Sequence, residues 1–134
     1  MKIASIDIGL KRIGLALCLQ SNIIIPKEPI LRRNRNQAAL EVKEFLDFWD
    51  IKTLVVGIPK GGSSEEEMTR RIKHFVSLIR FDKNIVYINE YGTSKEAKEL
   101  TKGIIKHKKD GKIDSIAAKI ILERYLELIK NSKM

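Results

Sequence analysis

The chain has 134 residues, a length that suits one domain and leaves little room for a second, so we expect residues 1–134 to fold as one unit. Hydrophobic residues make up 43% and charged residues 32%, as in an ordinary globular protein. The apolar stretches are far shorter than the roughly 20 residues that span a bilayer. Asp7 also falls where a signal peptide has its apolar core. We therefore expect a cytoplasmic protein with no membrane partner.

Basic residues outnumber acidic ones, with 26 Lys and Arg against 17 Asp and Glu and a formal net charge of +9. Such an excess draws a protein toward polyanions, and this kind of binding weakens as salt rises. The alternative is solubility alone, since net charges of roughly 2–8 are common in small domains. The charge lies just above that band and favours a nucleic-acid partner.

Cysteine and histidine are too scarce to build the commonest metal sites. Cys18 is the only cysteine, which excludes an intrachain disulfide and a thiolate zinc cluster. It stands in an apolar segment, and we expect a small core residue there. His74 and His107 are the only histidines. One falls in a helical pattern and the other in a lysine run, so we expect no histidine-based metal site or catalytic triad.

The N-terminal segment predicts an antiparallel meander. Residues 2–8 alternate, which predicts a strand with Ile3, Ser5 and Asp7 on one face. Gly9 ends this strand, residues 11–12 form a turn, and residues 14–19 supply its hairpin partner. A third strand is expected at residues 23–25, interrupted by two prolines, and the basic residues 32–36 are expected to form a loop.

The remaining chain alternates between helical and strand patterns. Apolar residues at helical spacing predict helices, and β-branched runs predict buried strands. The expected elements are helix 37–50, strand 53–58, a Gly-rich loop 59–64, helix 68–79, strand 84–90, a short helix from Thr93 or Ser94 to Leu100, and a last helix 112–129. Together they predict an α/β fold in which one mixed five-stranded sheet, an antiparallel meander followed by parallel strands, carries helices on both faces.

Three acidic residues stand at a strand, a strand end and a helix start: Asp7, Glu90 and Asp114. An isolated Asp114 is typical of a helix cap, and an isolated Glu90 of a solvated strand end. Asp7 is harder to explain, because an unpaired carboxylate inside an apolar strand is costly and has no strand propensity. The topology allows all three to converge at one edge of the sheet.

Three converging carboxylates would suit Mg²⁺ or Mn²⁺, which prefer oxygen ligands. Two such ions about 4 Å apart can activate water and stabilise the leaving oxygen in phosphodiester hydrolysis. Acyl transfer and zinc hydrolysis are not suited to such a site. Basic residues near these acids are candidates for holding phosphate: Lys11, Arg12, Lys106, Lys108, Lys109 and Lys112.

Two further segments allow a phosphate-binding interpretation. Arg32, Arg33 and Arg35 either extend the basic groove or form a solvated surface. Residues 57–64 are Gly-rich and precede a helix, but they lack the spacing of a nucleotide-binding P-loop. The acidic residues that follow would repel a phosphate, so we interpret this segment as a flexible link and helix cap.

Several segments in order along the chain resemble the YqgF/RuvX family of bacterial proteins. The matching segments are DIGLKRIGLA at 7–16, VVGIP at 55–59, NEYGTS at 89–94, KIDSIAA at 112–118 and ILERYL at 121–126. The resemblance implies a ribonuclease H-like fold with Asp7, Glu90 and Asp114 as the acidic triad; in our leading hypothesis Asp7 would bridge the metal ions. The family is linked to maturation of the 5′ end of the small-subunit ribosomal RNA precursor, and earlier to resolution of branched DNA.

The chain departs from the family at positions near the triad. The family usually has Asp and Arg on either side of the central Glu, whereas this chain has Asn89 and Tyr91. It also has Cys18 and Leu19 where Ser-Asp is frequent. These departures bear on substrate grip and rate and leave the triad itself intact.

The leading hypothesis is a metal-dependent nuclease that acts on structured RNA, namely the 5′ end of the 16S ribosomal RNA precursor. A Holliday junction resolvase is the enzyme alternative, which requires a homodimer, whereas the nuclease can act as a monomer. A non-catalytic RNA-binding factor that keeps the fold is a second class. A fragment of an actin-like ATPase shares the Asp-x-Gly start, but the short chain argues against two lobes around a nucleotide.

Overall fold

The computed structural model describes residues 2–20, 22–59, 64–89 and 112–132, and in the last helix it describes the side chains of residues 115–131. The strands are β1 (Ile3–Ile8), β2 (Arg12–Gln20), β3 (Ile23–Leu31), β4 (Thr53–Ile58) and β5 (Asn84–Asn89), and the helices are α1 (Arg35–Phe48), α2 (Glu65–Ile79) and α4 (Lys112–Ser132). The strands form one sheet in the order β3-β2-β1-β4-β5. β1, β2 and β3 are antiparallel neighbours, while β4 and β5 run parallel to β1, as the sequence predicts.

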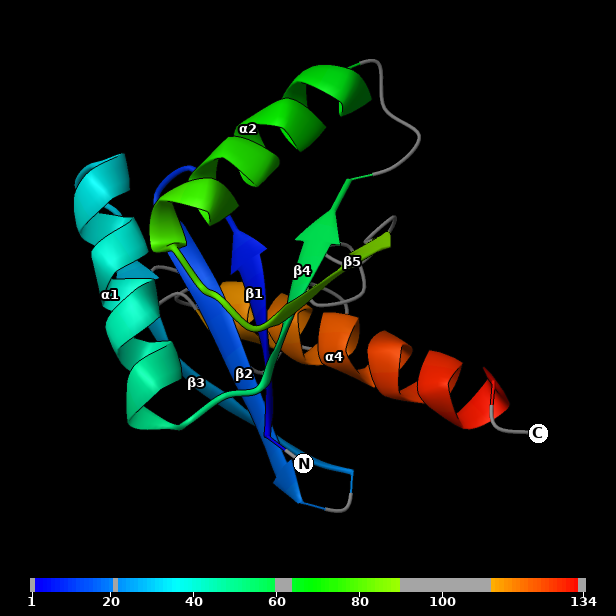
Figure 1. The fold of residues 1–134 in the computed structure, drawn as a ribbon. Coiled ribbons are helices and arrows are strands. Elements are labelled where there is room, and N and C mark those ends of the chain that lie inside the picture. Colours follow the sequence, from blue (N-terminus) through cyan, green and yellow to red (C-terminus); the bar gives the residue numbers. More distant parts are fainter. Residues whose placement is uncertain (1, 21, 60–63, 90–111, 133–134) are drawn as a thin grey trace.

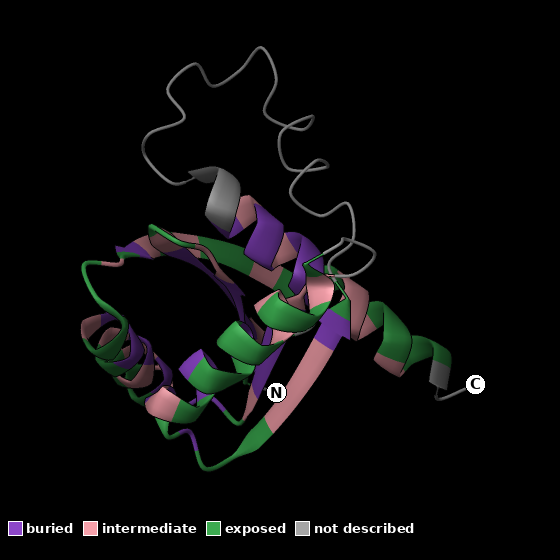
Figure 2. Ribbon diagram, turned by 90° about the horizontal axis from the view of Figure 1, so that it is seen from above, coloured by how far each residue is buried: buried purple, intermediate pink, exposed green. Residues whose placement is uncertain are grey.

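The sheet lies between two helical layers (Figure 1). Helices α1 and α2 cover one face, and α4 crosses the other. One hydrophobic cluster joins residues such as Ile6 and Leu15 to Val42 and Phe75 of the two covering helices. A second cluster joins residues of the opposite face to α4. Figure 2 shows that buried residues line the sides of the helices that face the sheet, whereas exposed residues lie on their outer sides.

The alternation in β1 places its side chains as the sequence predicts. Ala4 and Ile6 belong to the cluster under α1 and α2, and Ile3 belongs to the cluster under α4. Ser5 contacts α4 directly through a hydrogen bond. Cys18 is fully buried in the α4 cluster, which confirms its expected role as a small core residue.

The third strand is longer than the sequence predicts. We expected residues 23–25 with an interruption at Pro26 and Pro29, whereas β3 runs through both prolines to Leu31. The reason is its position: β3 is an edge strand, where a proline that lacks an N–H can face away from the neighbouring strand. Register shifts against β2 absorb the remaining irregularity.

Helix α1 begins inside the segment that we expected to be a loop. Asn34 is its N-cap and accepts a hydrogen bond from the Gln37 backbone, while the Gln37 side chain accepts one from the Asn34 backbone. This reciprocal capping box satisfies two amide groups at the helix start. Arg35 and Asn36 are therefore helical, and only residues 32–34 connect β3 to the helix.

The other element predictions are largely confirmed, with shifted ends. Strand β4 matches residues 53–58, and its four central residues are buried. Helix α2 begins at Glu65 rather than Met68, with three acidic residues in its first turn, where they favour the helix dipole. Ser64 is its N-cap residue, but the Ser64 side chain makes no cap hydrogen bond.

Strand β5 is more exposed than the buried strand we expected. It lies at the other edge of the sheet, and of its residues only Ile88 is buried. The predicted short helix after Thr93 and most of the Gly-rich loop lie outside the described residues. None of the helices within the described ranges is long and apolar enough to cross a membrane.

Candidate active site

Asp7 lies near the C-terminal end of β1, in the middle of the sheet. Its cross-strand partner is Gly14 of β2, and the residue is only 8% exposed. Because side chains alternate along a strand, Asp7 shares the α4-facing side of β1 with Ile3 and Ser5. A carboxylate so deeply buried requires compensation by hydrogen bonds or a cation.

The parallel pairing of β1, β4 and β5 places the C-terminal end of β5, which directly precedes Glu90, at the same edge of the sheet. Ile6 of β1 lies level with Val56 of β4, which lies level with Tyr87 of β5. Strand β5 then ends at Asn89, two residues beyond that level, as β1 does at Ile8. The residue that precedes Glu90 therefore stands at the edge where Asp7 lies, although Glu90 itself is outside the described residues.

Three side-chain hydrogen bonds hold α4 against this face of the sheet. The Ser5 hydroxyl of β1 donates to the Ala118 carbonyl at 2.6 Å, and the Ser115 hydroxyl donates to the Lys27 carbonyl of β3 at 2.6 Å. Arg124 donates through Nη1 to the Asn89 carbonyl at the end of β5, at 3.2 Å. Sequence reasoning missed these residues, although a serine beside Asp7 on one face of an apolar strand is a recognisable signal.

The fastening of α4 also fixes the backbone at Asp114. Asp114 is the third residue of α4 and immediately precedes the buried Ser115. It therefore lies in the first turn of α4. The Asp114 side chain lies outside what the structure describes, and its convergence with Asp7 stays a prediction.

The turn between β1 and β2 is tightly closed. The Gly9 amide donates to the Arg12 carbonyl at 3.0 Å. A Cβ at Gly9 would stand 2.7 Å from that carbonyl oxygen, so only glycine fits without a backbone shift. Arg32 reinforces the turn twice, because its amide donates to the Lys11 carbonyl at 2.8 Å and its Nη1 donates to the Gly9 carbonyl at 2.9 Å.

Two of the predicted phosphate-holding residues lie on this turn. Lys11 is exposed, and Arg12, the first residue of β2, is partly buried. Lys106, Lys108 and Lys109 lie outside the described residues, as does the side chain of Lys112. Lys11 and Arg12 are therefore the predicted basic residues whose location near Asp7 can be stated.

The three predicted metal ligands, Asp7, Glu90 and Asp114, are all hard oxygen donors. Within the described residues no group of three His, Cys, Asp or Glu side chains gathers to hold a metal ion. Of the predicted ligands only the Asp7 side chain falls within those residues. The Asp7 carboxylate is buried at the edge of the sheet where β5 ends. Its oxygen atoms are the kind of ligand that Mg²⁺ and Mn²⁺ prefer.

Comparison with known proteins decides the family. Residues 1–128 match the sequence model of the RuvX family, which is described as Holliday junction resolvase. The chain belongs to the RuvX family.

The chain is 65% identical over 128 residues to a protein of Sulfurovum sp. (strain NBC37-1), and the match covers 96% of this chain and 100% of that protein. It is 57% identical over 129 residues to a protein of Campylobacter jejuni (strain 81116), with coverage of 96% and 100%. Both relatives carry the name "Putative pre-16S rRNA nuclease".

Solved structures agree on the fold of this RuvX-family chain. Thermus thermophilus RuvC superposes with a TM-score of 0.60 at 12% identity, covering 96% of each chain. The fowlpox virus Holliday junction resolvase superposes with a TM-score of 0.54 at 18% identity, covering 96% of this chain and 99% of that one. The predicted family and the predicted ribonuclease H-like fold are thus both confirmed.

Proposed function

We propose that this RuvX-family chain is a divalent-metal-dependent nuclease that hydrolyses phosphodiester bonds, with Asp7, Glu90 and Asp114 as its metal ligands. The observation that carries the proposal is the buried Asp7 carboxylate at the C-terminal edge of β1. The hydrogen bonds of Ser115 and Arg124 support it, because they tie the neighbours of Asp114 and Glu90 to the same face of the sheet. The family membership and the names of the relatives support nuclease activity.

The donor set fits Mg²⁺ or Mn²⁺ because all three proposed ligands are carboxylates. When bound, such ions activate the attacking water and stabilise the leaving oxygen. The contribution of the protein is to hold the ligands still. β1 has hydrogen-bonded neighbours on both sides, β2 and β4, and Asp7 itself is paired with Gly14 of β2. Ser5 ties β1 to α4, the helix that carries Asp114.

Basic residues around this edge would hold the nucleic-acid backbone. Lys11 is exposed on the rigid β1–β2 turn, four residues after Asp7 in the chain, and Arg12 follows it. We propose that these two residues and Lys106, Lys108, Lys109 and Lys112 contact phosphates. Contacts of this kind position a strand and carry no base sequence. Recognition would then depend on the shape of the nucleic acid.

We propose the 5′ region of the 16S ribosomal RNA precursor as the substrate. The names of relatives at 57–65% identity over nearly the whole chain support this assignment. A four-way DNA junction is the second candidate, since the family carries the description Holliday junction resolvase. Resolution of a junction requires two sites that face two strands, so it predicts a homodimer, whereas cleavage of an RNA leader does not.

The test compares cleavage of a 16S-precursor leader RNA by the wild type, Asp7→Asn and Asp82→Asn. Asp82 is the matched control, since it is an exposed aspartate that pairs with Lys83 at the surface. Removal of a residue that only supports a metal ligand costs about 10–100-fold, so loss of Asp7 itself should exceed about 100-fold. EDTA should abolish cleavage, and Mg²⁺ or Mn²⁺ should restore it.

The other outcomes separate the alternatives. Cleavage by Asp7→Asn at the wild-type rate refutes the proposed site. RNA that is bound but never cut, by any protein and with either metal ion, favours the non-catalytic binding factor. Cleavage of a four-way DNA junction, with the RNA left intact and a dimer seen by sedimentation, favours the resolvase.

A further inference from the structure

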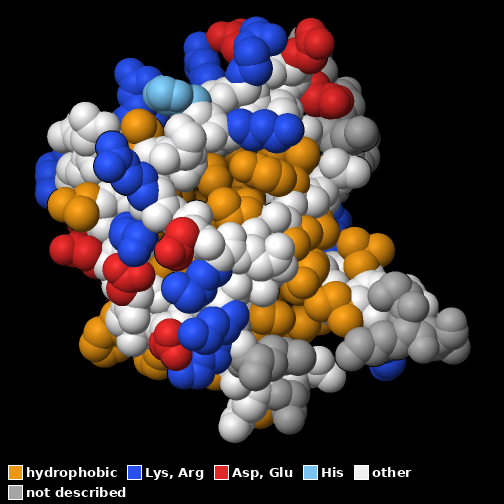
Figure 3. Space-filling model, in the orientation of Figure 1, with side chains coloured by type: hydrophobic (Ala, Val, Ile, Leu, Met, Phe, Trp, Pro, Cys, Tyr) orange, Lys and Arg blue, Asp and Glu red, His pale blue; other side chains and the backbone are white. Residues whose placement is uncertain are grey.

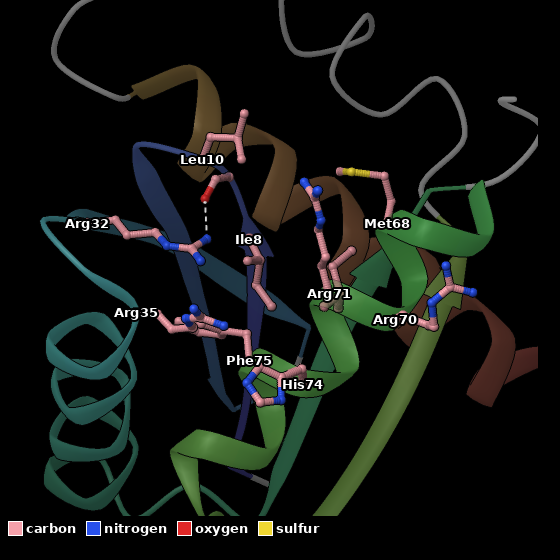
Figure 4. Close-up of a pocket in the computed structure, with 11 residues that line it drawn as sticks. Ile8, Leu10, Arg32, Arg35, Met68, Arg70, Arg71, His74 and Phe75 are labelled. Atoms are coloured by element: carbon pink, nitrogen blue, oxygen red, sulfur yellow. Dashed lines mark hydrogen bonds between the residues drawn. The ribbon is translucent and has the colours of Figure 1, made fainter. Parts of the chain in front are cut away.

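A cavity of about 640 Å³ lies between the β1–β2 turn and helices α1 and α2. Its lining is strongly basic and contains Arg32, Arg35, Arg70, Arg71 and His74. None of the described residues that line it is Asp or Glu. Figure 4 shows Arg32, Arg35 and Arg71 arranged around the space beside Ile8 and Leu10. Figure 3 shows blue Lys and Arg side chains beside the pale-blue histidine. We call this cavity the arginine pocket.

The structure separates the arginines that follow β3. Arg32 and Arg35 line the pocket, whereas Arg33 does not and instead pairs with Glu41 at 3.6 Å. Arg71 pairs with Glu67 at 2.7 Å, but its side chain stays 63% exposed. The sequence left open whether this arginine run belongs to a binding groove. The structure assigns two of the three residues to a concave surface.

The positive charges of Arg32 and Arg35 lie close enough to affect each other. The guanidinium of Arg32 is partly buried over the Phe75 ring, 5.1 Å from its centroid. Burial lowers the Arg32 pKa, and the nearby charge of Arg35 lowers it further. Arg35 is also the first residue of α1, where a positive charge opposes the helix dipole and no acidic residue offsets it. A bound anion would offset the repulsion between the two guanidinium groups and the unfavourable interaction of Arg35 with the helix dipole.

The pocket lies next to the proposed metal site, on the other side of the β1–β2 turn. By the alternation along β1, Asp7 lies on the α4 side of the sheet, whereas Ile8 lines the pocket beneath α2. Gly9, at the lip of the pocket, is two residues from Asp7, at most about 7 Å along the Cα trace. An extended strand that crosses the turn at Lys11 would therefore reach both sites. Leu10, which is 78% exposed, offers an apolar surface at the crossing point.

We propose that the arginine pocket binds two phosphate groups of the nucleic-acid strand that reaches Asp7 across the β1–β2 turn, one at Arg35 and one at Arg71. Guanidinium groups suit this role because their planar N–H forks match phosphate oxygens. The assignment rests on the proposed nuclease function, since it takes the strand in the pocket to be the one that reaches Asp7. A free nucleotide carries the same phosphate chemistry, so the test must distinguish binding of a nucleotide from binding of a strand.

The experiment measures binding of a labelled single-stranded 12-nucleotide RNA by fluorescence anisotropy, in EDTA and over a salt series. The variants are Arg35→Gln, Arg71→Gln and the double variant, and Arg33→Gln is the matched control outside the pocket. Each lost phosphate contact reduces the slope of log K against log salt by about 0.7 for a single strand. The double variant should lose about 1.4 from the slope and bind about 25-fold more weakly at 0.1 M salt. The control should keep the wild-type slope.

Two results overturn the proposal. The first is a double variant with the slope of the Arg33→Gln control. The second is binding of 5′-AMP or inorganic phosphate in the pocket without any role in RNA binding. In that case the ligand shifts the NMR signals of His74 in the wild type but not in the double variant, while the double variant binds RNA as tightly as the wild type. If the double variant unfolds by circular dichroism, Arg35→Gln alone decides through a slope change of about 0.7. Because EDTA prevents metal-dependent cleavage, this experiment measures RNA binding alone. Its failure can therefore be told apart from failure of the proposed nuclease activity, which the Asp7→Asn cleavage assay tests.

Discussion

Ser5→Ala is the sharpest test of how α4 is held over the sheet. The Ser5 side chain is fully buried, and its hydroxyl donates to the Ala118 carbonyl, 113 residues away in the chain. Substitution by alanine removes one oxygen atom and one donor. The Ala118 carbonyl remains within the hydrogen-bonded α4 helix, so no buried acceptor is orphaned. The loss is therefore that of one buried hydrogen bond.

A hydrogen bond of this kind contributes about 0.5–1.5 kcal/mol to the free energy of unfolding. We expect about 1 kcal/mol from Ser5→Ala, a fall in Tm of about 3–5 °C for a chain of this length. A protein with the usual 5–15 kcal/mol of stability stays folded after such a loss. Because the variant stays folded, a marked fall in its nuclease activity would indicate that α4, and with it Asp114, is displaced.

The assay is urea unfolding together with RNA cleavage, and Ser77→Ala is the control. The Ser77 hydroxyl also donates to a carbonyl at 2.6 Å, that of His74, but it lies on the exposed side of α2. We expect it to lose under about 0.5 kcal/mol, as surface substitutions usually do. Equal losses of stability and activity in Ser5→Ala and Ser77→Ala would refute the idea that Ser5 anchors α4.

Three further predictions concern the turn, the end of β5 and an exposed carboxylate. Gly9→Ala forces a backbone shift and should lower the free energy of unfolding by about 1–3 kcal/mol, whereas a loss below 0.5 kcal/mol in urea would contradict the tight turn. Arg124→Leu removes the hydrogen bond to the Asn89 carbonyl and should lower kcat more than it changes KM, with partial rescue by Arg124→Lys. The pKa of Asp50 is lowered by hydrogen bonds to Lys52 and Lys2, so its contribution to stability is present above the unfolded pKa and is lost as pH falls through the folded value. Asp50→Asn should therefore flatten the acid limb of a stability curve, and an unchanged limb would show that these exposed pairs contribute nothing.

Local pattern was enough to predict much of this protein. The period-two alternation of residues 2–8 identified β1 and the face on which Asp7 lies, and the buried run at residues 53–58 identified β4. Such patterns are legible because side-chain direction follows from backbone geometry over a few residues. The motifs that resemble the YqgF/RuvX family added the fold and the family. The convergence of Glu90 and Asp114 with Asp7 stays a prediction, as does the choice of metal.

Tertiary structure decided what depends on residues far apart in the chain. β3 passes through Pro26 because strand order makes it an edge strand, and strand order is a property of the packed sheet. Arg32 and Arg33 are adjacent and chemically identical, yet Arg32 lines the pocket over Phe75 of α2, whereas Arg33 pairs with Glu41 of α1. The partner of Ser5 lies 113 residues away. The sequence alone determined the family and the approximate position of most of the described elements, whereas these contacts follow only when the helices bury their apolar faces against the sheet.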